Sequence, residues 1–262
     1  MSTVTRPETR FIKQQERDDV LYVTLDRPPL NVLTISMMSE LIGVFDQVAA
    51  RQDSLRAVVL RGAGKAYSAG VDISEHQGET LRPLLDSFHR LMLRVLASPV
   101  PVISVVHGYA FGGGCELATV SDMVLIAEDA KIGVPEIKLA VFPPAAAVLF
   151  PRLIGTHRAL ELILTGEPIS GAEAARIGLA NRAVPAAELD AALEALLARL
   201  RATSAAALRL ARRAVLDTLD RSTEEALHYL EQVQVEQLIP SHDAQEGLRA
   251  FLEKRAPVWQ HR

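Results

Sequence analysis

The sequence predicts an α/β protein in which buried parallel strands alternate with amphipathic helices. Short runs rich in β-branched residues, at 20–25, 56–60 and 102–106, are separated by stretches whose apolar residues recur at helical spacing. From residue 151 onward only helical patterns remain. Strands that alternate with helices favour a parallel sheet covered by helices. These residues alone suggest a doubly wound sheet followed by a helical region.

The composition is that of an ordinary soluble protein. The chain has 262 residues, of which 49% are hydrophobic, enough to bury a large core. The net charge of −4 and the scattered basic residues favour neither nucleic acid nor an anionic membrane as a partner. The single cysteine, Cys115, excludes an internal disulfide and fits a reducing compartment. Residues 1–11 resemble an unstructured lead-in rather than a secretory signal, and no apolar run could span a bilayer, so we expect a cytoplasmic protein.

The first half of the chain contains three strand and helix signals in alternation. A strand at Val20–Leu25 stops at two prolines, and a helix follows with apolar residues at helical spacing from 37 to 48. A second strand at 56–60 leads into a loop that contains Tyr67–Asp72, and a second amphipathic helix covers 82–97. This order supports the α/β prediction.

The centre of the chain is a glycine-rich stretch, Pro101–Glu116. A buried strand at Val102–Val106 is followed by three consecutive glycines, 112–114, which open a short helical segment. The first N–H groups of a helix have no partner within the helix, and glycine lets a ligand approach the backbone closely. Such a turn can hold a developing negative charge.

The second half begins with a strand at Met123–Ala127, then a short extended piece at 131–136. An apolar segment, Leu139–Leu149, is predicted to be a loop because Pro143 and Pro144 interrupt it. Helical patterns then fill the rest of the chain, at 156–164, 171–177, 188–200, 205–219, 223–238 and 243–254.

Spacing leaves the role of the glycine turn open. The Walker-type phosphate loop and the dinucleotide fingerprint both require residues that this stretch lacks. A tight turn for close packing is the simpler interpretation of three glycines, but two carboxylates, Glu116 and Glu136, favour a functional one. Two carboxylates beside backbone donors could act as an acid/base pair next to a polarised carbonyl. By spacing alone, Glu136 could equally be a solvated charge at a strand end.

Three segments resemble the signature segments of the crotonase (enoyl-CoA hydratase/isomerase) superfamily. They are Tyr67–Ile73 (YSAGVDI), His107–Ala118 (HGYAFGGGCELA) and Gly133–Ile137 (GVPEI), and the tail from Glu246 to Pro257 is also similar. The resemblance implies a core of repeated ββα units at 1–200, wound as a spiral in place of a doubly wound sheet. It also implies a C-terminal helical region at 201–262 that forms a homotrimer or a dimer of trimers.

The resemblance further implies an acyl-CoA substrate, no separate cofactor and no metal. The N–H groups of Ala69 and Gly113 would form an oxyanion hole for the thioester carbonyl. Glu116 and Glu136 would hold a water between them and add it to the double bond, and two carboxylates that share a water should titrate as a coupled pair. The other positions expected to bind the substrate or its CoA are Ala66, Ser68, Val71, Asp72, Ile73, Phe142, Pro144 and Lys254.

One position departs from the family pattern. Where the common hydratases have a glycine whose N–H helps to orient the water, this chain has Pro144, and proline has no N–H. This difference argues against straight-chain specificity. The apolar residues around it resemble the branch that hydrates alicyclic dienoyl-CoA thioesters.

Other residues and other functions carry less weight. Cys115 and His107 fit structural roles, His76 could contact substrate or be a bystander, and no metal-ligand spacing is present. Besides a hydratase, the same fold could support an isomerase or a hydrolase, a non-catalytic protein that binds RNA, or a purely structural trimer. The two glutamates favour the hydratase.

Overall fold

The computed structural model describes residues 10–262; most of the predicted N-terminal lead-in lies outside this range. The main sheet has six strands in the order β1-β2-β3-β4-β6-β9. Their bounds are β1 (Ile12–Arg17), β2 (Val20–Leu25), β3 (Ala57–Gly62), β4 (Val102–Val106), β6 (Met123–Ala127) and β9 (Arg182–Val184). β1 pairs antiparallel to β2, and all other neighbours are parallel. The strand order follows the chain without reversal, so the doubly wound topology suggested by the pattern is wrong.

A second sheet of three short strands lies beside the first. It consists of β5 (Tyr109–Phe111), β7 (Lys131–Gly133) and β8 (Ile169–Ser170), with β5 and β7 parallel. An isolated bridge from Ser68 to Ala110 attaches the loop after β3 to this sheet. Each turn of the chain therefore contributes one strand to the main sheet and one extended piece beside it, which is the spiral that the resemblance implies.

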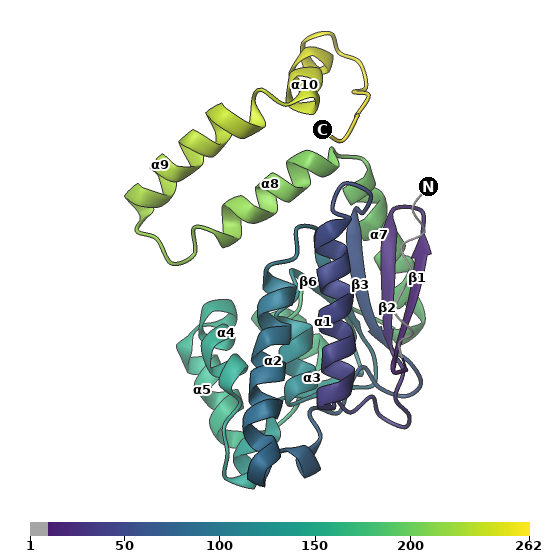
Figure 1. The fold of residues 1–262 in the computed structure, drawn as a ribbon, viewed down its shortest axis with the longest axis vertical. Coiled ribbons are helices and arrows are strands. Elements are labelled where there is room, and N and C mark those ends of the chain that lie inside the picture. The colour runs from purple at the N-terminus through teal and green to yellow at the C-terminus, as the bar shows by residue number, and fades with distance from the viewer. Residues whose placement is uncertain (1–9) are drawn as a thin grey trace.

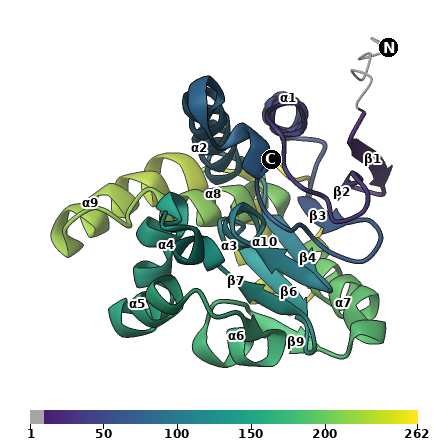
Figure 2. The same ribbon diagram turned by 90° about the horizontal axis from the view of Figure 1, so that it is seen from below.

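Helices cover the main sheet on both faces. α1 (Ile35–Ala50) and α2 (Leu81–Leu96) pack together on one side, and α7 (Leu189–Arg201) lies on the other (Figures 1 and 2). α1 begins where the Thr34 hydroxyl accepts a hydrogen bond from the Met37 N–H. Short 3₁₀ turns lie at η1 (Ile73–Glu75), η2 (Gly78–Thr80), η3 (Pro135–Leu139) and η4 (Ala186–Glu188).

The segment predicted as a loop at 139–149 is mostly helical, which corrects that prediction. η3 ends at Leu139, and α4 (Pro144–Ile154) begins with Pro144 as its first residue. Proline suits this position because its fixed φ is helical and its missing N–H would have no partner there. α5 (Thr156–Thr165) packs against α4, and α6 (Gly171–Ile177) follows β8.

The C-terminal helices extend from the core as an arm (Figure 1). The arm comprises α8 (Ala205–Leu216), α9 (Thr223–Val233), a π-helical turn η5 (Gln234–Leu238) and α10 (His242–Leu252). Large apolar side chains lie exposed along it: Val215, Leu219, Leu227, Val235, Leu248, Phe251, Leu252 and Val258. Within residues 10–262, no helix has the length and apolar character needed to cross a membrane.

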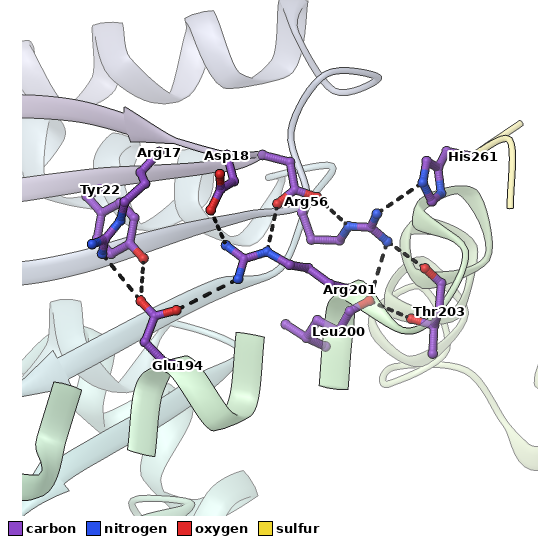
Figure 3. Close-up of polar contacts among 10 residues, drawn as sticks. Arg17, Asp18, Tyr22, Arg56, Glu194, Leu200, Arg201, Thr203 and His261 are labelled. Carbon is purple, nitrogen blue, oxygen red and sulfur yellow. Dashed lines mark hydrogen bonds and ion pairs between the residues drawn. The ribbon is translucent and has the colours of Figure 1, made fainter. Parts of the chain in front are cut away.

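Buried arginines join the arm to the core. Arg56, at the start of β3, is 5% exposed and donates to Asp19, to the carbonyl of Thr203 and toward the His261 ring (Figure 3). Arg212 of α8 forms an ion pair with Asp122 at 2.7 Å and donates to carbonyls at the end of α2. The arm therefore has a defined orientation on the core.

Candidate active site

A cavity of about 300 Å³ opens between α2, α3 (Gly113–Thr119), η1, η3 and the start of α4. Its wall is mainly apolar and includes three titratable side chains, His76, Glu116 and Glu136. The remaining lining residues are Ala69, Gly70, Val71, Ile73, Leu84, Leu85, Phe88, Gly112, Gly113, Pro135, Leu139, Val141, Phe142, Pro143 and Pro144. Carboxylates in an apolar cavity are candidates for catalytic acid or base groups.

The glycine turn at Gly112 and Gly113 allows neighbouring side chains to lie close to its backbone. Gly112 has φ +51° and ψ −127°, a conformation that side chains rarely allow, and a Cβ there would lie 2.5 Å from Oε1 of Glu136. A Cβ on Gly113 would lie 2.8 Å from Cγ1 of Val71. The turn therefore brings the start of α3 against both Glu136 and the loop that contains Val71.

Glu116 lies in the first turn of α3 and is only 3% exposed. Its Oε1 accepts a hydrogen bond from the N–H of Ala146 in α4 at 2.8 Å. Burial raises the pKa of Glu116 to about 7; hydrogen bonding from Ala146 opposes this shift, and the nearby Glu136 adds to it. Glu116 can therefore take up or release a proton near neutral pH.

Glu136 lies in η3, directly after Pro135, and lines the same cavity. Its Oε2 is buried and has no hydrogen-bond partner within residues 10–262, the one such side-chain oxygen or nitrogen in that range. Burial raises the pKa of this carboxyl as well. A buried carboxylate oxygen without a partner is costly, so a water or a ligand group is expected beside it.

The structure corrects one half of the predicted oxyanion hole. The N–H of Ala69 is not free, because it donates to the carbonyl of Leu30 at 2.9 Å. Leu33 pairs with the backbone on both sides of Val71, accepting from Asp72 and donating to Gly70. Backbone groups alternate in direction along an extended chain. The N–H of Val71 therefore faces away from Leu33, and no residue in the described chain accepts it.

The N–H of Gly113 is the second unpaired donor at this place. Gly113 is the first residue of α3, where N–H groups have no partner within the helix. A Cβ added to Gly70, the residue before Val71, would lie 3.6 Å from the Gly113 nitrogen, so the two donors belong to neighbouring segments. The sequence predicted Gly113, but the direction of the Val71 N–H depends on the partner of Leu33, which lies far away in the sequence.

The other predicted substrate residues fall into two groups. Val71, Ile73, Phe142 and Pro144 line the cavity. Ala66 and Ser68 do not: each is 0% exposed, so neither can contact a ligand here. Asp72 also lies outside the lining, because its carboxylate accepts from Ser74 and lies 3.5 Å from Arg27.

Lys254 lies just beyond the end of α10 on the arm and is not part of this cavity, so its proposed contact with CoA stays a prediction. The sequence predicted the helix that contains Leu84, Leu85 and Phe88, but it did not predict that these three side chains line the cavity.

Two other candidate residues lie outside the cavity. His107 is structural, with Nε2 3.0 Å from the carbonyl of Gly64. Cys115 is fully buried, which raises the pKa of its thiol and makes it a poor nucleophile.

Comparisons with known proteins identify the family of the chain. Residues 15–262 match the family model described as enoyl-CoA hydratase/isomerase. The chain is 40% identical over 256 residues to the cyclohexa-1,5-dienecarbonyl-CoA hydratase of Thauera aromatica, covering 94% of this chain and 95% of that protein. It is 37% identical over 258 residues to a probable enoyl-CoA hydratase of Mycobacterium tuberculosis, covering 97% and 99%.

Solved structures show the same similarity. The enoyl-CoA hydratase of Bacillus anthracis superposes with a TM-score of 0.91 at 32% identity, covering 97% of this chain and all of that one. A putative enoyl-CoA hydratase from Streptomyces coelicolor superposes with a TM-score of 0.90 at 30% identity, covering 100% of both chains. Matches in sequence and in fold thus extend over nearly the whole length. The chain belongs to the enoyl-CoA hydratase/isomerase family and is an enzyme with the crotonase fold.

Proposed function

We propose that this enzyme adds water to the double bond of an α,β-unsaturated CoA thioester. The observation that carries the proposal is a pair of carboxylates in one cavity, the buried Glu116 and the half-buried Glu136 with its buried Oε2, beside two unpaired backbone donors. Each feature suits one part of the reaction. The donors can bind an oxygen that becomes negative, and the carboxylates can hold a water and move its protons.

In the proposed mechanism, the thioester oxygen accepts from the N–H groups of Val71 and Gly113. A water lies between the unpartnered Oε2 of Glu136 and the free oxygen of Glu116. As the water oxygen bonds to the β-carbon, the carboxylate pair takes one of its protons, and negative charge moves to the thioester oxygen. The pair then delivers a proton to the α-carbon. Because Glu136 lies close enough to raise the pKa of Glu116, we treat the two carboxyls as a coupled pair in this mechanism and assign the shared proton to the pair.

The two parts of the site contribute on different scales. Removing one oxyanion donor from an enzyme typically costs about 10²- to 10³-fold in rate, because the donor acts mainly in the transition state. A positioned acid or base contributes about 10²- to 10⁴-fold. Loss of either glutamate should therefore nearly abolish hydration.

The substrate we favour is an alicyclic dienoyl-CoA thioester. Pro144 lines the cavity and has no N–H to orient a water, unlike the glycine of straight-chain hydratases. The cavity of about 300 Å³ is at the small end of ligand sites, which suits a compact ring. The Thauera relative, named as a cyclohexa-1,5-dienecarbonyl-CoA hydratase, supports the same class.

We further propose that the arm forms a homotrimer or a dimer of trimers. Its apolar side chains, such as Phe251 at 83% exposure and Leu252 at 81%, favour burial against other copies of the chain. In such an assembly Lys254 would reach the CoA phosphates of a neighbouring subunit. Light scattering with sedimentation would test the stoichiometry.

A substrate panel tests the reaction. The protein is incubated with straight-chain, branched and alicyclic enoyl- and dienoyl-CoA thioesters, and products are followed by absorbance and mass. We expect an alicyclic dienoyl-CoA to gain the mass of one water, and Glu116→Gln and Glu136→Gln each to abolish this gain while thioester binding persists. A product with a shifted double bond, or free CoA without any hydroxyacyl product, would assign the site to an isomerase or a hydrolase.

A further inference from the structure

Helix α4 begins without a local cap. Its N-cap residue, Pro143, offers no side-chain hydrogen bond, and Pro144 at the first position has no N–H. The N–H of Ala147 already donates to the Pro143 carbonyl at 3.0 Å. The N–H groups of Ala145 and Ala146 therefore need acceptors from elsewhere in the fold.

Glu116 supplies the missing acceptor from a different helix. Its Oε1 lies 2.8 Å from the nitrogen of Ala146, and Ala146 is 0% exposed while Glu116 is 3% exposed. A hydrogen bond from a helix N-terminus to a buried carboxylate is strengthened by charge and by the helix dipole. This contact therefore orients the carboxylate within the cavity wall.

We propose that the N–H of Ala146 is a positioning group that holds Oε1 of Glu116 and reserves Oε2 for the reacting water. This rests on the proposed hydration. The reason is chemical: a protonated oxygen is a poorer acceptor than a carbonyl or carboxylate oxygen, so the hydrogen bond from Ala146 to Oε1 favours the proton on the other oxygen. The proton that Glu116 gains and loses is therefore carried on Oε2.

The groups around Glu116 support a fixed position for its proton. Glu136 and His76 line the same cavity, and the thiol of Cys115 is the neighbouring group along α3. Hydrogen bonds from Ala146 and Ala145 lower the pKa of Glu116 against the larger effect of burial. Loss of the Ala146 donor should thus raise this pKa and free the carboxylate to rotate.

The test removes one N–H without altering any side chain. Ala146→lactic acid, introduced by nonsense suppression, replaces the peptide N–H with an ester oxygen of nearly the same shape. The matched control, Ala147→lactic acid, removes an ordinary helical hydrogen bond to Pro143. The pKa of Glu116 is read by infrared titration of the carboxyl band, identified by its absence in Glu116→Gln, so this readout needs no turnover.

We expect the Ala146 ester to raise the pKa of Glu116 by about one to two pH units, given the usual strength of hydrogen bonds to charged groups. Its kcat should fall at least about tenfold because the carboxylate is misplaced. The Ala147 ester should leave the pKa of Glu116 unchanged. An unchanged pKa in the Ala146 ester, or equal shifts in both esters, would overturn the proposal. If no thioester is hydrated at all, the proposed function fails while the infrared result still stands.

Discussion

Replacing Gly112 with alanine should separate catalysis from substrate binding. The backbone of Gly112 has φ +51° and ψ −127°, which costs an L-residue about 1–3 kcal/mol. The new Cβ would also lie 2.5 Å from Oε1 of Glu136, whereas ordinary contacts begin at 3.4 Å. The carboxylate must therefore retreat by about 1 Å, a misplacement that can reduce the rate about 10²-fold.

The assay for Gly112→Ala measures kcat with the preferred thioester, Kd for a non-reactive CoA thioester, and unfolding by urea. We expect kcat to fall about 100-fold, Kd to change little, and stability to fall by about 1–3 kcal/mol. Gly43→Ala is the matched control, because nothing lies within 4 Å of its Cβ and it sits within α1. That variant should gain about 0.5–1 kcal/mol. A folded Gly112→Ala variant with kcat within threefold of the parent would show that the position of Glu136 does not depend on Gly112.

Three further predictions concern titration and binding. Burial raises the pKa of Glu116 from 4.5 to about 7, so protonated Glu116 stabilises the fold fully below pH 4.5, and this stabilisation is lost as pH rises through 7. In urea unfolding, the free energy of unfolding of Glu116→Gln should exceed that of the parent by up to about 3 kcal/mol at pH 8 and should equal it at pH 4. The imidazole of His76 lines the cavity and has no hydrogen-bond partner in the described chain. His76→Leu removes this polar group from the pocket, so KM for a hydrocarbon acyl-CoA should fall about fivefold. A rise in KM would mean that His76 contacts the substrate. Burial tends to raise the pKa of Asp243, but its hydrogen bonds outweigh burial and lower this pKa to about 2. The parent should therefore be more stable than Asp243→Asn above pH 3.8, and this difference should be lost as pH falls from 3.8 toward 2. A stability difference in urea unfolding that does not change with pH would contradict this.

Local patterns predicted most of the regular elements. α6 (Gly171–Ile177) was predicted with its observed bounds, and α5 and α7 within a residue or so at each end. β1 was missed because its sequence, IKQQER, is mostly polar: it is an edge strand whose side chains are largely at the surface. α4 was missed because Pro143 and Pro144 were read as breakers, although proline is favoured at the first helical position.

The residues of the candidate site also differ in whether a local sequence pattern could predict them. Glu116, Glu136 and Gly113 could be found from short motifs, because each motif places its residue within a few positions of a turn. The Val71 donor could not, since its direction depends on the pairing of Leu33 with the backbone around it. Likewise, the acceptor for the Ala146 N–H lies 30 residues away in the sequence. Contacts of this kind are set by tertiary structure, which no local pattern encodes.

The tail beyond α10 connects the arm to the sheet, so it would influence the assembly that we propose. The carboxylate of Asp243 accepts from the N–H groups of Gln260 and His261, each at 2.7 Å, and the His261 ring lies 3.3 Å from the guanidinium of Arg56, which directly precedes β3. Cleavage by a carboxypeptidase after residue 259 would remove both contacts at once. The angle at which the arm leaves the core, and with it the spacing between copies in the proposed assembly, would then depend on fewer contacts, among them the ion pair of Arg212 with Asp122.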